Sequence, residues 1–312
     1  MRIIHTRKRV FANGDHAFQN KMVLLVWILS ALYWKKHGNN TLVLYTDNRT
    51  LEDIKKVGFE ILYDEINTDL FEDPEINAQL DFTLYWAMPK LLALRHEKLV
   101  LGNDCVISDQ DVVPMSDLSR FWTNSDVTVW SNKEYLHIRS IYPELRDLSV
   151  PPGYEFPYWF TGNAQPLNTG VLHIKDKEIA KFYTDEVLRM SIGNLNPKRN
   201  TVCVTMCNVE QRLLAEVIKH KDLSYTTVQP NNKGLFNRNG FHTHGYKGSV
   251  LNHNGLQWHL SILYLIKKEH PEMFNKLINH KIFTKEREFL FSGRSFNLID
   301  ELSIYNIKKE GF

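Results

Sequence analysis

The segment Thr41-Leu42-Val43-Leu44-Tyr45-Thr46-Asp47-Asn48 joins an apolar run to a polar turn signal, a pattern typical of a buried strand that ends in a loop. On either side of it, residues 18–37 predict a long helix and residues 51–57 a second one. Short strands are expected further out, at residues 2–6 and 59–63. This β-α-β-α-β order predicts an α/β fold with a mostly parallel sheet flanked by helices.

Open sheets of this kind bind ligands at the carboxyl ends of their strands. Thr6 and Asp47 stand at two such ends, so both are candidate substrate-binding residues. The alternative for each is an ordinary strand-end or turn residue, because Thr and Asp are common in turns.

The 312-residue chain has a net charge of +2, with 43% hydrophobic and 24% charged residues, as ordinary globular proteins do. This balance gives no reason to expect nucleic acid or an anionic membrane as a partner. Three cysteines favour a reducing compartment over a disulfide framework. The apolar run at residues 22–34 is shorter than the roughly 17–25 residues of a membrane anchor, so it predicts a buried helix. We therefore expect no membrane span and a cytoplasmic location.

The alternation of helices and strands continues along the chain. Helices are expected at residues 81–96, 177–190 and 209–220, and strands at residues 105–108, 126–130 and 167–174. Residues 143–166 are irregular and aromatic, and a loop of this length is typical of a lid over a bound ligand. We expect a single catalytic domain over residues 1–281 and a helical tail over residues 282–312 packed on it.

An acidic pair, Asp109 and Asp111, follows the apolar strand at residues 105–108. Both carboxylates can reach one cation from a turn just past the strand, and hard divalent ions prefer carboxylate oxygens. A diphosphate would fill the remaining positions of such an ion, which then acts as a Lewis acid and template. The alternative is a pair of surface turn residues, since Asp-x-Asp alone is a weak motif.

The same pair also fits phosphatases of the haloacid-dehalogenase type, in which the first Asp is a nucleophile. Those enzymes need a later acidic cluster for magnesium, and the aspartates beyond Asp117 are scattered along this chain. In those phosphatases the motif follows the first strand, whereas here it comes after three expected strands. The sequence therefore favours a metal-bound diphosphate over a phosphatase nucleophile.

Four segments in order resemble glycosyltransferase family 8 and related enzymes with the GT-A fold, a Rossmann-like mixed sheet. Residues 86–92 are similar to the helix before the family's acidic motif, where a basic residue, here Lys90, faces the donor. Residues 106–113 resemble its strand and Asp-x-Asp motif. Residues 166–172 are similar to the segment that lines the sugar site, and Glu210-Gln211 to an Asp-Gln pair that starts a later helix.

The family pattern also has a histidine metal ligand near the C-terminus, followed by a glycine and a phosphate-binding lysine. Here His242 has the family-like spacing to Gly245, His244 is equally near, and His253 ends a later apolar run. All three are candidate metal ligands beside the acidic pair, because His is a common metal ligand. Lys247 is the candidate phosphate lysine, although the Lys-Pro-Trp ending of the family is absent.

The resemblance implies transfer of a sugar from a nucleotide diphosphate sugar, UDP by default, to a hydroxyl of a glycan or other acceptor, with retention of configuration. Mn²⁺ is the expected cofactor because imidazole suits it better than Mg²⁺, which stays possible. The implied catalytic residues are Glu210 and Gln211, and the implied substrate-binding residues are Lys90, Asn168, Thr169, Gly170 and Lys247. Asn168 and Gln211 fit turn or cap roles equally well. A non-catalytic nucleotide-sugar binding protein stays open, because a fold does not fix an activity.

Overall fold

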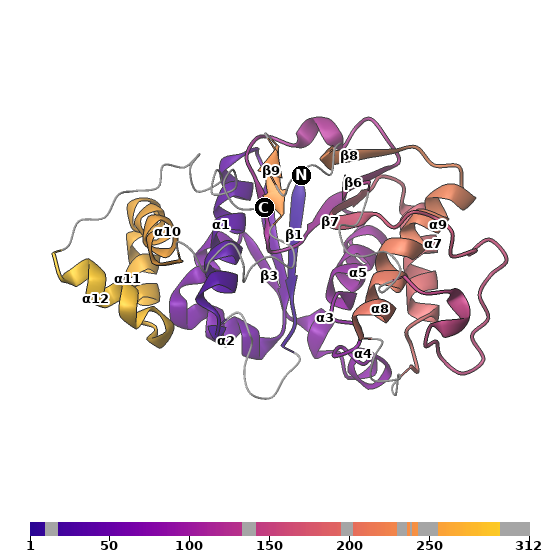
Figure 1. Cartoon of the computed structure of the whole chain (residues 1–312), viewed down its shortest axis with the longest axis horizontal. Coiled ribbons are helices and arrows are strands. Elements are labelled where there is room, and N and C mark those ends of the chain that lie inside the picture. The colour runs from indigo at the N-terminus through magenta and orange to yellow at the C-terminus, as the bar shows by residue number, and fades with distance from the viewer. Residues whose placement is uncertain are drawn as a thin grey trace.

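The structure, a computed structural model, describes residues 1–9, 18–132, 142–194, 202–229, 236–237, 239–242 and 255–293. A central sheet is covered by helices on both faces, which gives three layers (Figure 1). Each face carries its own buried apolar cluster, one under α1 and one under α5. The chain is therefore an α/β protein, as its alternating pattern predicts.

The central sheet has the strand order β3-β2-β1-β4-β7-β6-β8 within the described residues. The bounds are β1 Arg2–Arg7, β2 Thr41–Thr46, β3 Glu65–Asn67, β4 Cys105–Ser108, β6 Val127–Ser131, β7 Asn168–Ile174 and β8 Tyr225–Gln229. In this sheet β7 runs opposite to the other six, which makes the sheet mixed and mostly parallel. The carboxyl ends of β1, β2 and β4 therefore meet along one edge, where the start of antiparallel β7 joins them.

The helices divide between the two faces of the sheet (Figure 1). One face carries α1 Lys21–Lys36, α2 Asn48–Val57, α10 Gly255–Glu269, α11 Pro271–Asn279 and α12 Thr284–Phe291. The other carries α3 Asp69–Glu72, α4 Pro74–Gln79, α5 Met88–Arg95, α7 Lys177–Arg189, α8 Val202–Cys207 and α9 Leu213–His220. A second, small sheet joins β5 Val112–Pro114, β10 Gly240–His242 and β9 Phe236–Asn237.

Helix α1 is buried almost all round, which explains its nearly unbroken apolar sequence. Asn20 caps it by accepting a hydrogen bond from the backbone of Met22 at 3.0 Å. Among the described residues, no helix has both the length and the apolar character needed to span a bilayer. The apolar run at residues 22–34 is thus a core helix, as its length predicts.

Residues 59–63 do not form the expected third strand. Phe59–Leu62 is a 3₁₀ turn after Gly58, whose φ of 75° lets it end α2, and the strand β3 comes later, at Glu65–Asn67. Phe59 and Leu62 are both buried, and their spacing of three residues suits a 3₁₀ turn. The short apolar run did not distinguish the two structures.

Two expected helices are also divided differently. The helix expected at residues 81–96 is helical only from Met88, because Asp81 accepts hydrogen bonds from Thr83 in a separate turn. The helix expected at residues 209–220 begins earlier, with α8, and passes through a wide turn at Asn208–Arg212 before α9.

The aromatic loop expected as a lid packs instead on α7 and α9. The ring of Trp159 stacks on His220 at 5.0 Å between centroids and lies 5.5 Å from Phe182. Helix α9 precedes β8, a strand parallel to β6, so its C-terminal residue His220 lies away from the carboxyl ends of the strands. The stacked rings therefore hold the centre of the loop against α7 and α9.

The start of the expected C-terminal tail contacts two other helices. Glu286 of α12 accepts hydrogen bonds from Lys21 at 2.9 Å and pairs with His259 Nδ1 at 2.8 Å. Burial raises the pKa of Glu286, but His259 and Lys21 outweigh burial and lower it to about 2. This ion pair fastens α12 to α1 and α10, while residues 294–312 lie outside the described part of the chain.

Candidate metal centre

The acidic pair lies in a tight turn between β4 and β5. The backbone N–H of Asp109 donates to Gly170 O at 2.7 Å, and Val112 N–H donates back to Asp109 O at 3.1 Å. The Asp109 side chain is 30% exposed and that of Asp111 is 11% exposed. Both carboxylates are therefore held by a fixed backbone, and enough of them reaches solvent for a ligand to enter.

Helix α1 supports this turn from behind. Ser30 Oγ donates to Val112 O at 2.5 Å, just after the pair, and Trp34 Nε1 donates to Ser108 Oγ at 3.0 Å, just before it. Ser108 Oγ in turn donates to Asp109 O at 3.1 Å. Ser30 is the polar residue that interrupts the apolar run at residues 22–34, and this contact explains its presence there.

Gln110, between the two aspartates, ties the turn to the end of β1. Its Nε2 donates to Thr6 O at 2.8 Å, and its Oε1 accepts from Arg7 Nη1 at 3.3 Å. Thr6 thus lies beside the acidic turn, as its place at a strand end predicts, and contributes its carbonyl to the turn. Substrate binding by Thr6 stays a prediction.

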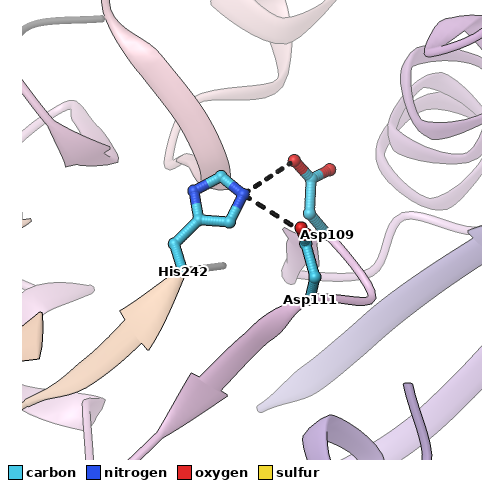
Figure 2. Close-up of side chains that lie close together, drawn as sticks. All are labelled: Asp109, Asp111 and His242. Carbon is cyan, nitrogen blue, oxygen red and sulfur yellow. Dashed lines mark ion pairs between the residues drawn. The ribbon is translucent and has the colours of Figure 1, made fainter. Parts of the chain in front are cut away.

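His242 completes a cluster with the two aspartates. Strand β10 pairs antiparallel with β5, and His242 lies opposite Val112, the residue that follows Asp111. His242 Nε2 is 3.2 Å from Asp111 Oδ1 and 3.7 Å from Asp109 Oδ2. Figure 2 shows one ring nitrogen facing both carboxylates, with His242 at the end of a strand and the aspartates on a loop.

Gly170 makes this position of the imidazole possible. A Cβ added at residue 170 would lie 2.5 Å from His242 Cε1 and 2.6 Å from His242 Nδ1, closer than real Cβ contacts allow. Gly170 lies in β7 beside the acidic turn, so the histidine ring packs directly over its backbone. A glycine that the sequence associates with a sugar site therefore has a second role, which is to leave space for a metal-ligand candidate.

The three side chains suit a divalent cation. Their candidate ligand atoms all lie within 4.8 Å of one another. Ligand atoms about 2.1 Å from one ion, at right angles to each other, stand about 3 Å apart, close to the shorter His242 distance. Two carboxylates and one imidazole fit a cation of intermediate hardness. In an octahedral ion, three positions would remain for water and phosphate oxygens.

Lys90 joins Asp109 to a second buried carboxylate. Its ammonium donates to Asp109 Oδ1 at 3.0 Å and to Thr169 O at 3.3 Å, and it forms an ion pair with Glu210 Oε1. Thr169 Oγ1 also donates to Glu210 Oε1, at 2.5 Å. Lys90 thus holds one oxygen of Asp109, while the other faces His242.

The charges of this group shift its pKa values. Burial lowers the pKa of Lys90, but the negative charges of Asp109 and Glu210 outweigh burial and raise it, so the ammonium stays charged. Burial raises the pKa of Glu210, and the charge of Asp109 raises it further, against the attraction of Lys90. The carboxylates of Asp109 and Glu210 thus share a single buried lysine.

The remaining predicted residues have defined contacts or lie outside the described residues. Asn168 Oδ1 accepts from Gly170 N at 3.0 Å, which is a turn-like role, and Gln211 Oε1 accepts from the Tyr142 hydroxyl. Asp47 caps α2 by accepting from Thr50 N at 2.9 Å and from Thr50 Oγ1. His244, Lys247 and His253 lie outside the described part of the chain.

No protein-family model and no curated protein matches this chain. Among solved structures, it is similar to the PaToxG glycosyltransferase, with 10% identity and a TM-score of 0.37 over 92% of this chain and 81% of that one. Mouse xyloside xylosyltransferase 1 matches at 11% identity and a TM-score of 0.34, over 72% of this chain and 83% of that one. The WbbM bifunctional glycosyltransferase matches at 12% and 0.38, over 66% of this chain and 36% of that one. Values this low carry no argument about activity, so function rests on the site.

We predict that Gly170→Ala displaces His242 and weakens Mn²⁺ binding at least about ten-fold, because the new methyl group collides with the ring. In a His242→Ala background the same change should cause no further loss of Mn²⁺ affinity. Calorimetry on the four proteins of this cycle measures the coupling. An unaltered Mn²⁺ affinity in the single Gly170→Ala protein would show that the close approach does not control the site.

We predict that Lys90→Met destabilises the fold by about 3–5 kcal/mol, because it leaves the buried Glu210 carboxylate without its cation. Adding Glu210→Gln should recover part of this loss, as measured by urea unfolding. The exposed pair Lys55–Glu52 is the control, and Lys55→Met should change stability by at most about 1 kcal/mol. If the Lys90→Met protein and the double variant lost the same free energy of unfolding, the ion pair between Lys90 and Glu210 would not be the cause.

Proposed function

We propose that this protein is a metal-dependent glycosyltransferase that moves a sugar from a nucleotide diphosphate sugar to an acceptor hydroxyl. The observation that carries the proposal is the cluster of Asp109, Asp111 and His242 at the carboxyl end of β4. Beside it lies a buried polar group of Lys90, Thr169 and Glu210. A metal site next to a polar pocket of this kind suits a diphosphate with a sugar attached.

The convergence of distant segments supports the proposal. Lys90, Asp109, Thr169 and Glu210 come from four parts of the chain, yet contacts of 2.5–3.3 Å link Lys90 to Asp109 and Thr169, and Thr169 to Glu210. These are the four segments that resemble glycosyltransferase family 8. Their joint position in space is what a common donor site requires, and this supports the proposal.

The ion has a clear chemical task in this arrangement. Asp109, Asp111 and His242 would hold the ion, which when bound would supply positive charge against the negative charge that develops on the departing diphosphate. We propose Mn²⁺ because the imidazole of His242 suits it, and UDP because of the family likeness. Retention of configuration rests on the same likeness.

The chain's own residues have distinct proposed roles. Lys90 fixes one oxygen of Asp109, so that the other faces the ion. Glu210 and Gln211 orient the sugar hydroxyls, together with Asn168 and Thr169. Lys247 supplies further positive charge toward the diphosphate, which lowers the energy of the transition state by preorganised electrostatics.

The geometry gives less support to a phosphatase with Asp109 as nucleophile. One oxygen of Asp109 is held by Lys90, and the other faces the imidazole of His242. Within the described residues, this cluster is the single group of three or more side chains suited to a metal. Its acidic members are Asp109 and Asp111, with no second pair of aspartates beside them. A haloacid-dehalogenase site needs such a pair for magnesium.

The setting of the enzyme is also part of the proposal. Cys105 and Cys207 are buried, and the low count of three cysteines is in keeping with the reducing, cytoplasmic compartment that we propose. A nucleotide sugar is the proposed donor, and a hydroxyl of a glycan or a smaller molecule is the proposed acceptor.

We predict that UDP binds with Mn²⁺, and that EDTA or the double change Asp109→Asn with Asp111→Asn lowers its affinity by at least about 100-fold, because the ion no longer bridges protein and diphosphate. Isothermal calorimetry measures the affinity. The control is Asp117→Asn, which alters an exposed aspartate of the same region whose carboxylate accepts hydrogen bonds from Ser119. It should leave the affinity unchanged.

Three outcomes would contradict the proposal. If neither EDTA nor the aspartate changes altered the affinity for UDP, the donor site would not depend on a metal. Release of phosphate from p-nitrophenyl phosphate, abolished by Asp109→Ala, would assign the site to a phosphatase instead. UDP-sugar binding with neither hydrolysis nor transfer to any acceptor would leave a binding protein.

A further inference from the structure

Trp86 differs from every other tryptophan of the chain in its exposure. The chain has seven tryptophans, and 49% of Trp86 is exposed. Trp159 is partly buried, and the other five are buried: Trp27, Trp34, Trp122, Trp130 and Trp258. An indole normally gains much free energy by leaving water, so one that stays half in solvent calls for a reason in its position.

Trp86 lies at the same edge of the sheet as the metal cluster. Helix α5 leads into β4 and packs beside it, so its first turn lies by the carboxyl end of that strand, where Lys90 reaches Asp109 at 3.0 Å. Hydrogen bonds from Met88 N to Tyr85 O, and from Lys90 N to Ala87 O, continue the turns back to Trp86. Trp86 thus comes four residues before Lys90, in the turn that leads into α5 at this edge of the sheet.

The backbone that carries Trp86 is held firmly. Its neighbour Tyr85 is fully buried, and the Tyr85 hydroxyl donates to Met190 O at 3.2 Å and accepts from Asn194 Nδ2 at 2.8 Å. Ala87, on the other side, is buried too. An exposed ring on a rigid segment loses little conformational entropy when a ligand stacks on it.

We propose that Trp86 is a stacking platform for a sugar ring of the acceptor, a specificity-determining role that rests on the proposed glycosyl transfer. A pyranose has a face of C–H groups that packs on the flat, electron-rich face of an indole, while its hydroxyls stay in water. The half-exposed indole offers such a face. Trp86 therefore selects acceptors that carry a saccharide over simple alcohols.

The position favours the acceptor over the donor. The donor diphosphate would occupy the cluster of Asp109, Asp111 and His242, and the transferred sugar would lie against Lys90 and Glu210. Trp86 lies in the turn before α5, four residues ahead of Lys90, and is half exposed. Because the buried Lys90 and Glu210 would take the transferred sugar, the half-exposed Trp86 is left for the acceptor.

Acrylamide quenching of tryptophan fluorescence tests the proposal, because Trp86 is the most accessible indole. The probes are methyl glycosides of glucose, galactose, mannose and N-acetylglucosamine, each titrated with and without UDP and Mn²⁺. We expect at least one of them to protect the wild-type emission from quenching. Calorimetry with that glycoside should show an affinity about ten-fold weaker in Trp86→Ala and largely kept in Trp86→Phe.

The matched control is Tyr158→Ala, which removes an aromatic ring that is 89% exposed but lies beside His220, away from the acidic pair. It should leave glycoside affinity unchanged. Protection by none of the glycosides would overturn the proposal. So would a weaker UDP affinity in Trp86→Ala with glycoside binding intact, since that result would place a nucleobase on the ring. The titrations without UDP measure glycoside binding alone, so they test the role of Trp86 even if the donor site is wrongly assigned.

Discussion

The close approach of the His242 ring to the backbone of Gly170 is the contact on which the metal centre depends. It lets an imidazole from the small sheet reach two carboxylates at the end of a strand in the large sheet. A side chain at residue 170 would separate the two halves of the site. The donor chemistry, the proposed ion and the position of the diphosphate all follow from this one absence of a Cβ.

The surroundings of the site oppose the repulsion between its negative charges. Asp109, Asp111 and Glu210 place three carboxylates in a small volume, and Lys90 neutralises two of them in part. A divalent ion beside His242 would offset the rest. The free energy that buries this polar group comes from the apolar packing around it, with α1 on one face of the sheet and α5 on the other. The buried charges that suit the proposed function therefore lower the stability of this edge, and the apolar packing of α1 and α5 offsets that cost.

Much of the fold could be predicted from sequence, because an apolar run marks buried elements such as residues 18–37 and 41–45. Residues 59–63 could not, since a short apolar run fits a strand and a 3₁₀ turn alike. The packing of the aromatic loop on α7 and α9 could not be predicted, because the stacking of Trp159 on His220 depends on tertiary contacts. At the site, motif order was enough to propose Lys90, Asp109 and Glu210. Motif order did not distinguish His242 from His244 and His253. His242 reaches the cluster because β10 pairs with β5, a contact between distant segments.

The most direct test of the account is a crystal structure with Mn²⁺ and UDP, in which anomalous scattering locates the ion. The account predicts one Mn²⁺ bound by Asp109, Asp111 and His242 Nε2, with diphosphate oxygens in the remaining positions. An ion bound without His242, or a diphosphate that does not touch the ion, would contradict it.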